Sequence, residues 1–229
     1  MSLSAALQIG NSALTASQLA IQVAGNNLAN AATPGYARQI AYLSPMRTDG
    51  SGRVNIGTGV RITDVRRQVD AALQARLSAA NSFEAATAQQ HDILSQVESA
   101  LGELGTNDLS SELAGFFNSW SERANLLQSS AVVVQQGQRL ADFIRHLRSE
   151  LSDQQGQIDI QTQNADSLLD QIAALNEQVS SAEAGGGHAN TLRDQRDQLV
   201  TQLSQLMDIS AVEQENGAVN ILVGSTPVV

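Results

Sequence analysis

The first 36 residues of the chain contain no charged side chain. Within them, apolar and small residues alternate at intervals of four and three, the spacing of a helix that packs along a seam against another helix. These positions are Leu3, Leu7, Gly10, Leu14, Ser17, Ile21, Ala24 and Leu28. The other faces carry Gln, Asn, Ser and Thr, where a solvent-exposed helix would carry Lys and Glu. We therefore expect a helix that other protein covers on several sides.

This helix is predicted to end near Asn30. The following Thr33-Pro34-Gly35-Tyr36 places Pro and Gly at the two central positions of a type II turn. The amides of Asn26, Asn27 and Asn30 are more than one helix end requires, so two interpretations stay open: they cap the helix, or they also bind a neighbouring chain. The predicted assembly interface consists of Leu7, Leu14, Ile21, Leu28, Asn26, Asn27, Asn30, Pro34, Gly35 and Tyr36.

The rest of the chain alternates between short strands and long helices. A small β element is predicted at 38–63, with one strand at 38–43 and a second, broken or bulged at its glycines, at 53–63. Helices are predicted from about 65 to 102, from caps at 106–108 to about 127, from 130 to 182, and from 190 to 206. Asn216-Gly217 between β-prone runs predicts a hairpin near 209–224.

Together these elements predict a mainly α fold, an elongated antiparallel bundle of long coiled-coil-like helices with short strands. The helix at 130–182 would be about 75 Å long, which favours a rod-shaped bundle. We predict an N-terminal assembly helix at 1–40, a helical bundle with its small β element at 41–208, and a hairpin at 209–229 that leads into an outer domain. Because the chain stops at Val229 without a cap or polar tail, we expect it to belong to a longer polypeptide.

No constellation for catalysis or ligand binding is apparent. The chain has no cysteine, and its three histidines, His91, His146 and His188, lack the spacing of metal ligands. Gly57 and Gly59 are not followed by the Lys of a phosphate loop. We predict no cofactor, no metal and no enzyme activity. The helix at 109–127 carries an aromatic cluster that is predicted to be core. It consists of Phe116, Phe117 and Trp120 together with the leucines Leu109, Leu113 and Leu127.

The net charge of −10 argues against nucleic acid as a partner. No stretch approaches the ~18 apolar residues of a membrane span, and the N-terminus lacks the basic region and apolar core of a secretory signal. We therefore expect neither membrane insertion nor export by a route that reads such a signal.

Several segments resemble a known family. The stretch from Asn26 to Tyr36 is similar to the N-terminal signature of the axial proteins of the bacterial flagellum, which comprise rod, hook and hook-associated proteins. Further segments resemble the hook-associated protein 1 family, which forms the hook–filament junction. They are residues 35–39, residues 59–70, the helix with Phe116 and Phe117, and residues 190–199 in front of the hairpin.

This resemblance implies a secreted structural component of the flagellum, an adaptor between hook and filament that self-assembles through its terminal helices. The implied partners are other copies of itself, hook protein, the next hook-associated protein, and the flagellar type III export apparatus with an export chaperone. The implied outer domain and C-terminal helices are missing from these 229 residues.

Two alternatives remain at this point. The chain could be another flagellar axial protein of the hook or rod. It could also be a cytoplasmic coiled-coil scaffold or signalling module, which would explain the heptads of the later helices but not the uncharged N-terminal helix.

Overall fold

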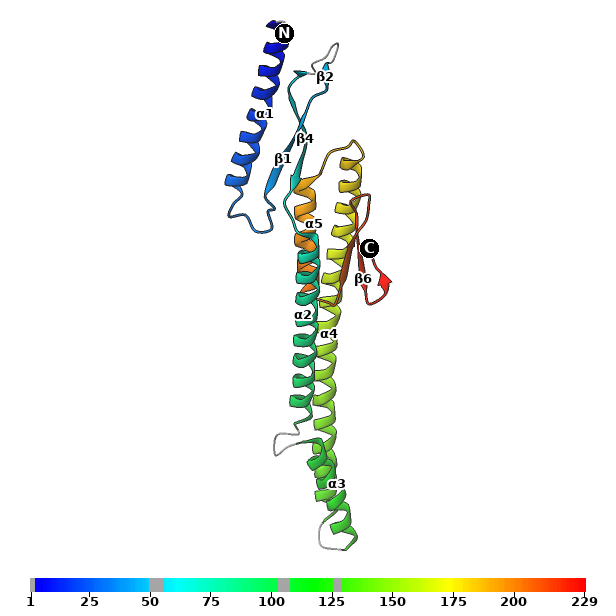
Figure 1. Cartoon of the computed structure of the whole chain (residues 1–229). Helices are drawn as coiled ribbons and strands as arrows, with labels where there is room; N and C mark the ends of the chain where they lie inside the picture. The colour runs from blue at the N-terminus through cyan, green and yellow to red at the C-terminus, as the bar shows by residue number, and fades with distance from the viewer. Residues whose placement is uncertain (1–2, 50–55, 103–107, 126–128) are drawn as a thin grey trace. The chain divides into compact units, whose positions relative to one another are not determined.

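The computed structural model describes residues 3–49, 56–102, 108–125 and 129–229. These residues form five helices and seven short strands, which confirms the predicted mainly α fold (Figure 1). The helices are α1 (Leu3–Ala29), α2 (Ala71–Leu101), α3 (Leu109–Ala124), α4 (Ser130–Glu183) and α5 (Asn190–Ser204). The strands are β1 (Gln39–Pro45), β2 (Thr48–Asp49), β3 (Ile56–Gly57), β4 (Val60–Arg67), β5 (Ser210–Glu213), β6 (Val219–Val223) and β7 (Thr226–Pro227).

The chain divides into two compact units. The first consists of Met1–Ser82 with Ser167–Val229, and the second of Phe83–Asp166, so that α2 and α4 each contribute to both. The domains predicted at 1–40, 41–208 and 209–229 stay a prediction. Within the described residues, no helix is both long and apolar enough to cross a membrane.

In the first unit, β1 and β4 form an antiparallel hairpin whose register shifts between Tyr42 and Leu43. The prediction that helical structure begins near Val65 is wrong. β4 continues to Arg67, which pairs with Gln39, and α2 starts only at Ala71. Strand pairing satisfies backbone groups as far as the Gln68 amide, which donates to the Arg38 carbonyl at 2.7 Å. The local apolar spacing does not override this pairing.

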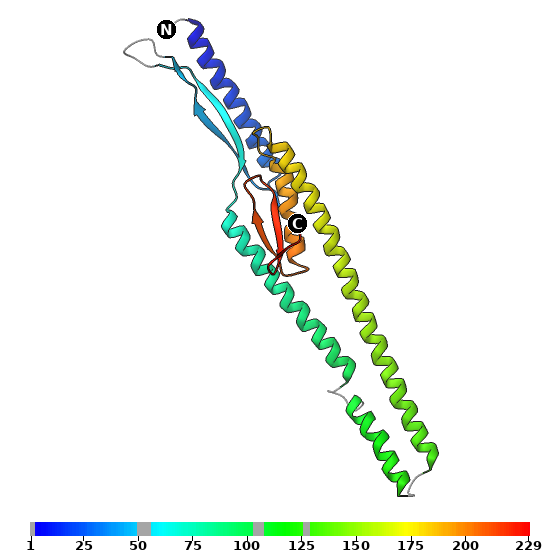
Figure 2. The ribbon, with the colours of Figure 1, turned by 90° about the vertical axis from the view of Figure 1, so that its right-hand side faces the viewer.

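α1 lies alongside this hairpin in both ribbon views (Figures 1 and 2). The side of α1 that is wholly or partly covered recurs at intervals of four and three residues, as a helix against a flat surface requires. It consists of Ala5, Ile9, Ser12, Ala16, Leu19 and Val23. The Ser12 hydroxyl accepts a hydrogen bond from the Val60 amide at 3.2 Å and so fixes α1 to the beginning of β4.

The other half of this unit joins the end of α4, α5 and a three-stranded sheet in the order β5-β6-β7. The predicted hairpin is confirmed, with Gly217 at a φ of 83° in its turn. β7 was not predicted; it pairs with the end of β6. The buried apolar side chains of this region are Ile172, Val179, Val200, Leu203, Ile209, Val219 and Ile221.

In the second unit, Asp108 caps α3 by accepting a hydrogen bond from the Ser111 amide. The other candidate caps at 106 and 107, and Leu127, lie outside the described residues. The prediction that the aromatic cluster is core is wrong for Phe117 and Trp120, whose side chains are 62% and 55% exposed. Consecutive residues of a helix point about 100° apart. The part-buried Phe116 and the exposed Phe117 therefore cannot share one buried face.

Candidate assembly interface

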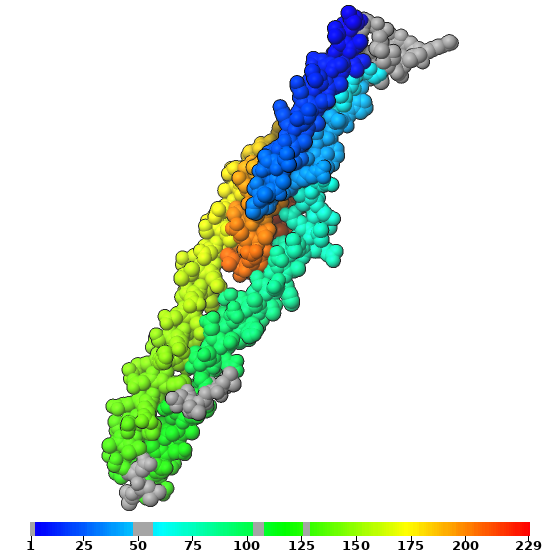
Figure 3. Space-filling view, turned by 90° about the vertical axis from the view of Figure 1, so that its left-hand side faces the viewer, coloured from blue at the N-terminus to red at the C-terminus, as the bar shows by residue number. Residues whose placement is uncertain are grey.

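The four large residues of the predicted seam form an exposed stripe along α1. Leu7, Leu14, Ile21 and Leu28 are between 59% and 79% exposed, and we call them the exposed stripe. Figure 3 shows α1 along the hairpin with one long side of the helix uncovered. An apolar row of this length on a helix without charges is typical of a surface that another helix covers.

α1 therefore carries two apolar rows rather than one. The row against the hairpin begins at Ala5 and includes Ile9, Ala16 and Leu19. The sequence contained a signal for it, because these residues also repeat at intervals of four and three, but the larger leucines of the exposed stripe dominate the pattern. Two rows on different sides explain why charges are missing from the whole helix.

The end of α1 is held by the side chain of Asn27. Its Oδ1 accepts hydrogen bonds from the Tyr36 hydroxyl and from the Gln39 amide, each at 2.8 Å, and its Nδ2 donates to the Gln39 carbonyl at 2.8 Å. Burial, and then the negative charge of Asp194, raise the pKa of the Tyr36 hydroxyl above its ordinary value, so it remains a donor. Asn27 and Tyr36 thus join helix, turn and strand within one chain.

Asn26 and Asn30 make local bonds beside this site. The side-chain Nδ2 of Asn30 donates to the Asn26 backbone carbonyl at 3.0 Å and to Asn26 Oδ1 at 2.9 Å. The side-chain Nδ2 of Asn26 donates to the Tyr36 hydroxyl at 3.4 Å. These contacts are the capping interactions expected at a helix end. A role for Asn26 and Asn30 in binding a neighbouring chain stays a prediction.

The turn at 33–37 packs against α5. The Tyr36 amide donates to the Thr33 carbonyl at 3.2 Å and Gly35 has a φ of 74°, as in the predicted type II turn. The side-chain Nε2 of Gln198 donates to the Pro34 carbonyl. The Ala37 amide donates to Asp194 Oδ2 at 3.2 Å. Pro34 and Gly35, predicted as interface residues, therefore lie against the chain's own α5.

α5 also binds the end of the hairpin. Arg67 Nη1 donates to Asp194 Oδ1 at 2.8 Å and to Asp197 Oδ2 at 2.7 Å. The side-chain Nδ2 of Asn190 donates to the Val65 carbonyl at 2.7 Å. Burial alone would lower the pKa of Arg67, but its hydrogen bonds and the two carboxylates outweigh burial and raise it, so the guanidinium stays charged.

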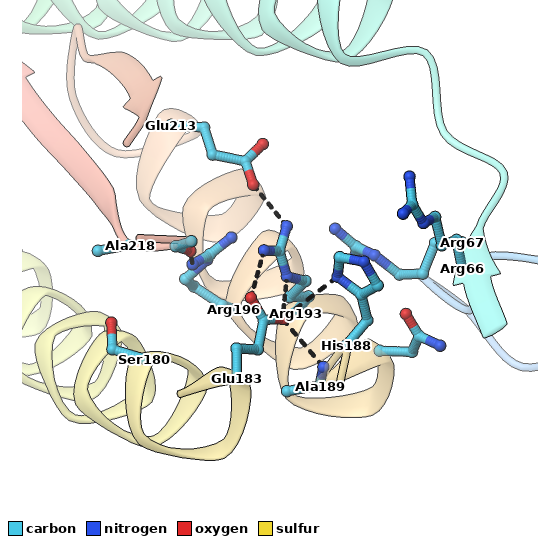
Figure 4. Close-up of polar contacts among 12 residues, drawn as sticks. Arg66, Arg67, Ser180, Glu183, His188, Ala189, Arg193, Arg196, Glu213 and Ala218 are labelled. Atoms are coloured by element: carbon cyan, nitrogen blue, oxygen red, sulfur yellow. Dashed lines mark hydrogen bonds and ion pairs between the residues drawn. The ribbon is translucent and has the colours of Figure 1, made fainter. Parts of the chain in front are cut away.

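On another side of α5, Arg193 joins the end of α4 to the C-terminal sheet (Figure 4). Its guanidinium binds both carboxylate oxygens of Glu183 at 2.7 Å and also binds Glu213 of β5. His188 Nε2 lies 3.0 Å from Asp64 Oδ2. The hydrogen bonds from Arg193, acting against burial, lower the pKa of Glu183 to about 2. Arg193 therefore pairs with other elements rather than along α5, although Asp197 lies four residues away.

The third arginine contact of α5 is buried. The Arg196 side chain, only 1% exposed, donates to the Gly217 carbonyl in the hairpin turn and to Asn176 Oδ1 at 3.2 Å. Burial lowers the pKa of Arg196, although the charge of Asp197 opposes this effect. The motif at 190–199 is thus a junction whose polar residues Asn190, Arg193, Asp194, Arg196, Asp197 and Gln198 bind the turn, β4, α4 or the C-terminal hairpin.

A groove of about 480 Å³ lies beside this junction, between the first turns of α2, α5 and β5. Among its charged side chains, Arg67, Arg193 and Asp197 are bound to one another or to neighbouring carboxylates. Among the described residues, no group of three His, Asp or Glu side chains could hold a metal ion. The arrangement is suited to fixing elements relative to one another.

Known proteins match most of the chain. Residues 94–229 match the family model described as the helical domain of flagellar hook-associated protein FlgK, and residues 7–36 match that of the flagella basal body rod protein. Over 225 residues the chain is 31% identical to flagellar hook-associated protein 1 of Bacillus subtilis, which covers 92% of this chain and 44% of the relative.

Two further relatives carry the same name. Flagellar hook-associated protein 1 of Escherichia coli is 27% identical, with 92% of this chain and 40% of the relative covered. The protein from Salmonella typhimurium is 27% identical, with 92% and 39% covered. The chain thus spans less than half the length of these relatives, and the expected resemblance to hook-associated protein 1 is confirmed. Since the FlgK helical-domain model matches more than half of its residues, the chain belongs to the flagellar hook-associated protein FlgK family.

Proposed function

We propose that this chain is part of a structural component of the bacterial flagellum, an adaptor at the hook–filament junction that self-assembles through its terminal helices. The observation that carries the proposal is the exposed stripe on an uncharged helix. Fully burying one Leu or Ile side chain contributes about 1.5–3 kcal/mol. Covering four such residues with a partner helix would offset much of the cost of association, which is about 4–15 kcal/mol.

The partners follow from the family. They are other copies of the chain, hook protein and the next hook-associated protein, and, during export, the flagellar type III apparatus with a chaperone. The protein would act outside the cell, at the junction, and without enzymatic activity. The similarity to flagellar hook-associated protein 1 of other bacteria supports this assignment over a cytoplasmic scaffold, and the match of residues 94–229 favours it over a rod or hook protein.

The test is a charge placed in the exposed stripe of the full-length protein. Ile21→Asp should leave the fold intact, because Ile21 is 71% exposed, but should prevent incorporation into flagella, because the carboxylate would be desolvated in the interface. Gln22→Asp is the matched control: it adds the same charge to an exposed neighbour on a different side of α1. Motility and immunogold labelling of the junction report assembly. Equal incorporation of both variants would remove the exposed stripe from the mechanism.

A further inference from the structure

The segment formed by α1 and the β1–β4 hairpin is attached to α5 at two places. One is the turn at 33–37, through Pro34 and Ala37. The other is the end of β4, through Val65 and Arg67. A body held at one point can pivot about it, whereas a second point removes most of that freedom. The direction of α1 therefore depends on both attachments.

Two residues of α5 make the first attachment, and they are one helical turn apart. Asp194 accepts from the Ala37 amide and Gln198 donates to the Pro34 carbonyl. Both contacts bind the main chain of the turn, so they depend on its path rather than on its side chains. Residues four apart on a helix lie on the same side, which allows the pair to grip both ends of a tight turn.

Asp194 also takes part in the second attachment. Its Oδ1 binds Arg67 while its Oδ2 binds the turn, and the residue is only 6% exposed. Gly35 shows how closely the turn approaches. A Cβ atom there would lie 2.1 Å from Gln198 Nε2. Only glycine fits at this point, both because of this contact and because of the positive φ.

We propose that Asp194 and Gln198 are positioning residues for the exposed stripe: by holding the turn at 33–37 on α5, they set the direction in which α1 extends. The role of this positioning in assembly rests on the proposed function, whereas the contacts that hold the turn do not depend on it. Asn27 transmits the position of the turn to α1, since it joins the helix end to Tyr36 and Gln39.

The length of α1 amplifies any pivot at the turn. Asn11 lies 18 residues before the helix end at Ala29, or about 27 Å along the axis. A pivot of ~10° would displace it sideways by about 5 Å, which is about half the distance of roughly 8–10 Å between the axes of packed helices. A sideways shift of this size would move the exposed stripe away from a partner helix that packs knobs into holes.

The experiment measures the distance between spin labels on α1 and α5. Cysteines introduced by Asn11→Cys and Gln202→Cys, both at exposed positions, carry the labels in the full-length protein on a cysteine-free background. Asp194→Ala and Gln198→Ala should shift or broaden the distance distribution by about 5 Å, the displacement of a ~10° pivot. Far-UV circular dichroism should remain unchanged.

Two controls separate the turn from the rest of the junction. Gln195→Ala removes an exposed amide from the same helix, and Asp197→Ala removes one partner of Arg67 but no contact to the turn. Gln195→Ala should leave the distance unchanged, and Asp197→Ala should change it less than Asp194→Ala. Gly35→Ala disturbs the same contact from the side of the turn, and it replaces Asp194→Ala in the experiment if that variant does not fold. Unchanged distances in both Gln198→Ala and Gly35→Ala would overturn the proposal.

The distance measurement does not depend on assembly, so the two proposals can fail separately. An unchanged distance refutes the positioning role even if Ile21→Asp blocks assembly. Normal assembly of Ile21→Asp refutes the exposed stripe even if the distance shifts. When both hold, Gln198→Ala should also lower incorporation into flagella, and Gln195→Ala should not.

Discussion

The side chain of Asn176 binds both backbone groups of Val219: its Nδ2 donates to the Val219 carbonyl at 2.8 Å, and its Oδ1 accepts from the Val219 amide at 2.9 Å. This amide on α4 thereby supplies the hydrogen bonds that a neighbouring strand would otherwise make at the beginning of β6. Oδ1 also accepts from Arg196, so one side chain links α4, α5 and the sheet.

Asn176→Leu should therefore destabilise the first unit by about 2–4 kcal/mol. The substitution leaves two backbone groups of Val219 without partners, and each such group costs about 1–3 kcal/mol when buried. Urea unfolding measures the loss, and amide exchange at Val219 should accelerate. Gln178→Leu, at an exposed position of the same helix, is the control and should stay near wild-type stability. Unchanged protection of the Val219 amide would contradict the role of Asn176.

Arg196→Ala should be among the most destabilising changes, by about 3–5 kcal/mol, because removing one member of a buried polar network leaves the others unpaired. The Gly217 carbonyl would lose its donor and a cavity would form under the hairpin. Differential scanning calorimetry is the measurement. Arg139→Ala, on an exposed face of α4, should change stability by less than about 0.5 kcal/mol. Equal losses of stability in the two variants would contradict a stabilising role for the contacts of Arg196.

Stability should also depend on pH through Glu183. Its pKa is lowered from 4.5 to about 2 in the folded chain, chiefly by hydrogen bonds from Arg193. A lowered pKa stabilises the fold above the ordinary value, and this stabilisation is lost as the pH falls through the folded value. The loss should therefore occur between pH about 4.5 and about 2, and should amount to no more than about 3 kcal/mol.

The control for this pH effect is Glu183→Gln, which cannot ionise. The difference in unfolding free energy between wild type and Glu183→Gln should be largest above pH ~5 and should shrink as the pH falls toward ~2. Urea titrations at several pH values measure it. A difference that stays constant over this range would show that the Glu183–Arg193 pair does not stabilise the fold.

Local spacing was sufficient to predict most helices. The start of α4 at Ser130, the cap at Asp108 and the Asn216-Gly217 hairpin follow from periodicity and turn chemistry, which act over a few residues. The beginning of α2 did not follow from them. Val65 fits a helical repeat, but its place in β4 depends on pairing with Ala41, far away in the chain.

The polar junction could be predicted only in part. The resemblance of residues 190–199 to a known family was recognised, but the contacts of their charged side chains were not predicted. Arg193 binds Glu183 and Asp197 binds Arg67, and sequence spacing does not bring these elements together. The exposure of Phe117 was missed for a similar reason. Hydrophobic composition indicates that a residue is suited to a core but does not indicate how many helix faces the fold can cover.

α1 approaches the β1–β4 hairpin closely at Gly59. Gly59 has a φ of 129°, and a Cβ atom there would lie 2.2 Å from the Ser12 hydroxyl oxygen. Gly59→Ala should cost more than about 1 kcal/mol, because it combines backbone strain with displacement of α1 from β4. Gly57→Ala is the matched control two residues away, since a Cβ there has open space around it.

Hydrogen exchange distinguishes the two glycine variants. In Gly59→Ala the amide of Val60 should lose protection, because it donates to Ser12, and the α1 amides should exchange faster. The C-terminal sheet should be unaffected, since its strands β5, β6 and β7 pair with one another. Ser12→Gly in the Gly59→Ala background removes the colliding side chain and should restore part of the stability, leaving the cost of the backbone conformation and of the lost hydrogen bond. Equal exchange rates in the Gly57→Ala and Gly59→Ala proteins would mean that close packing of α1 on β4 does not hold the helix in place.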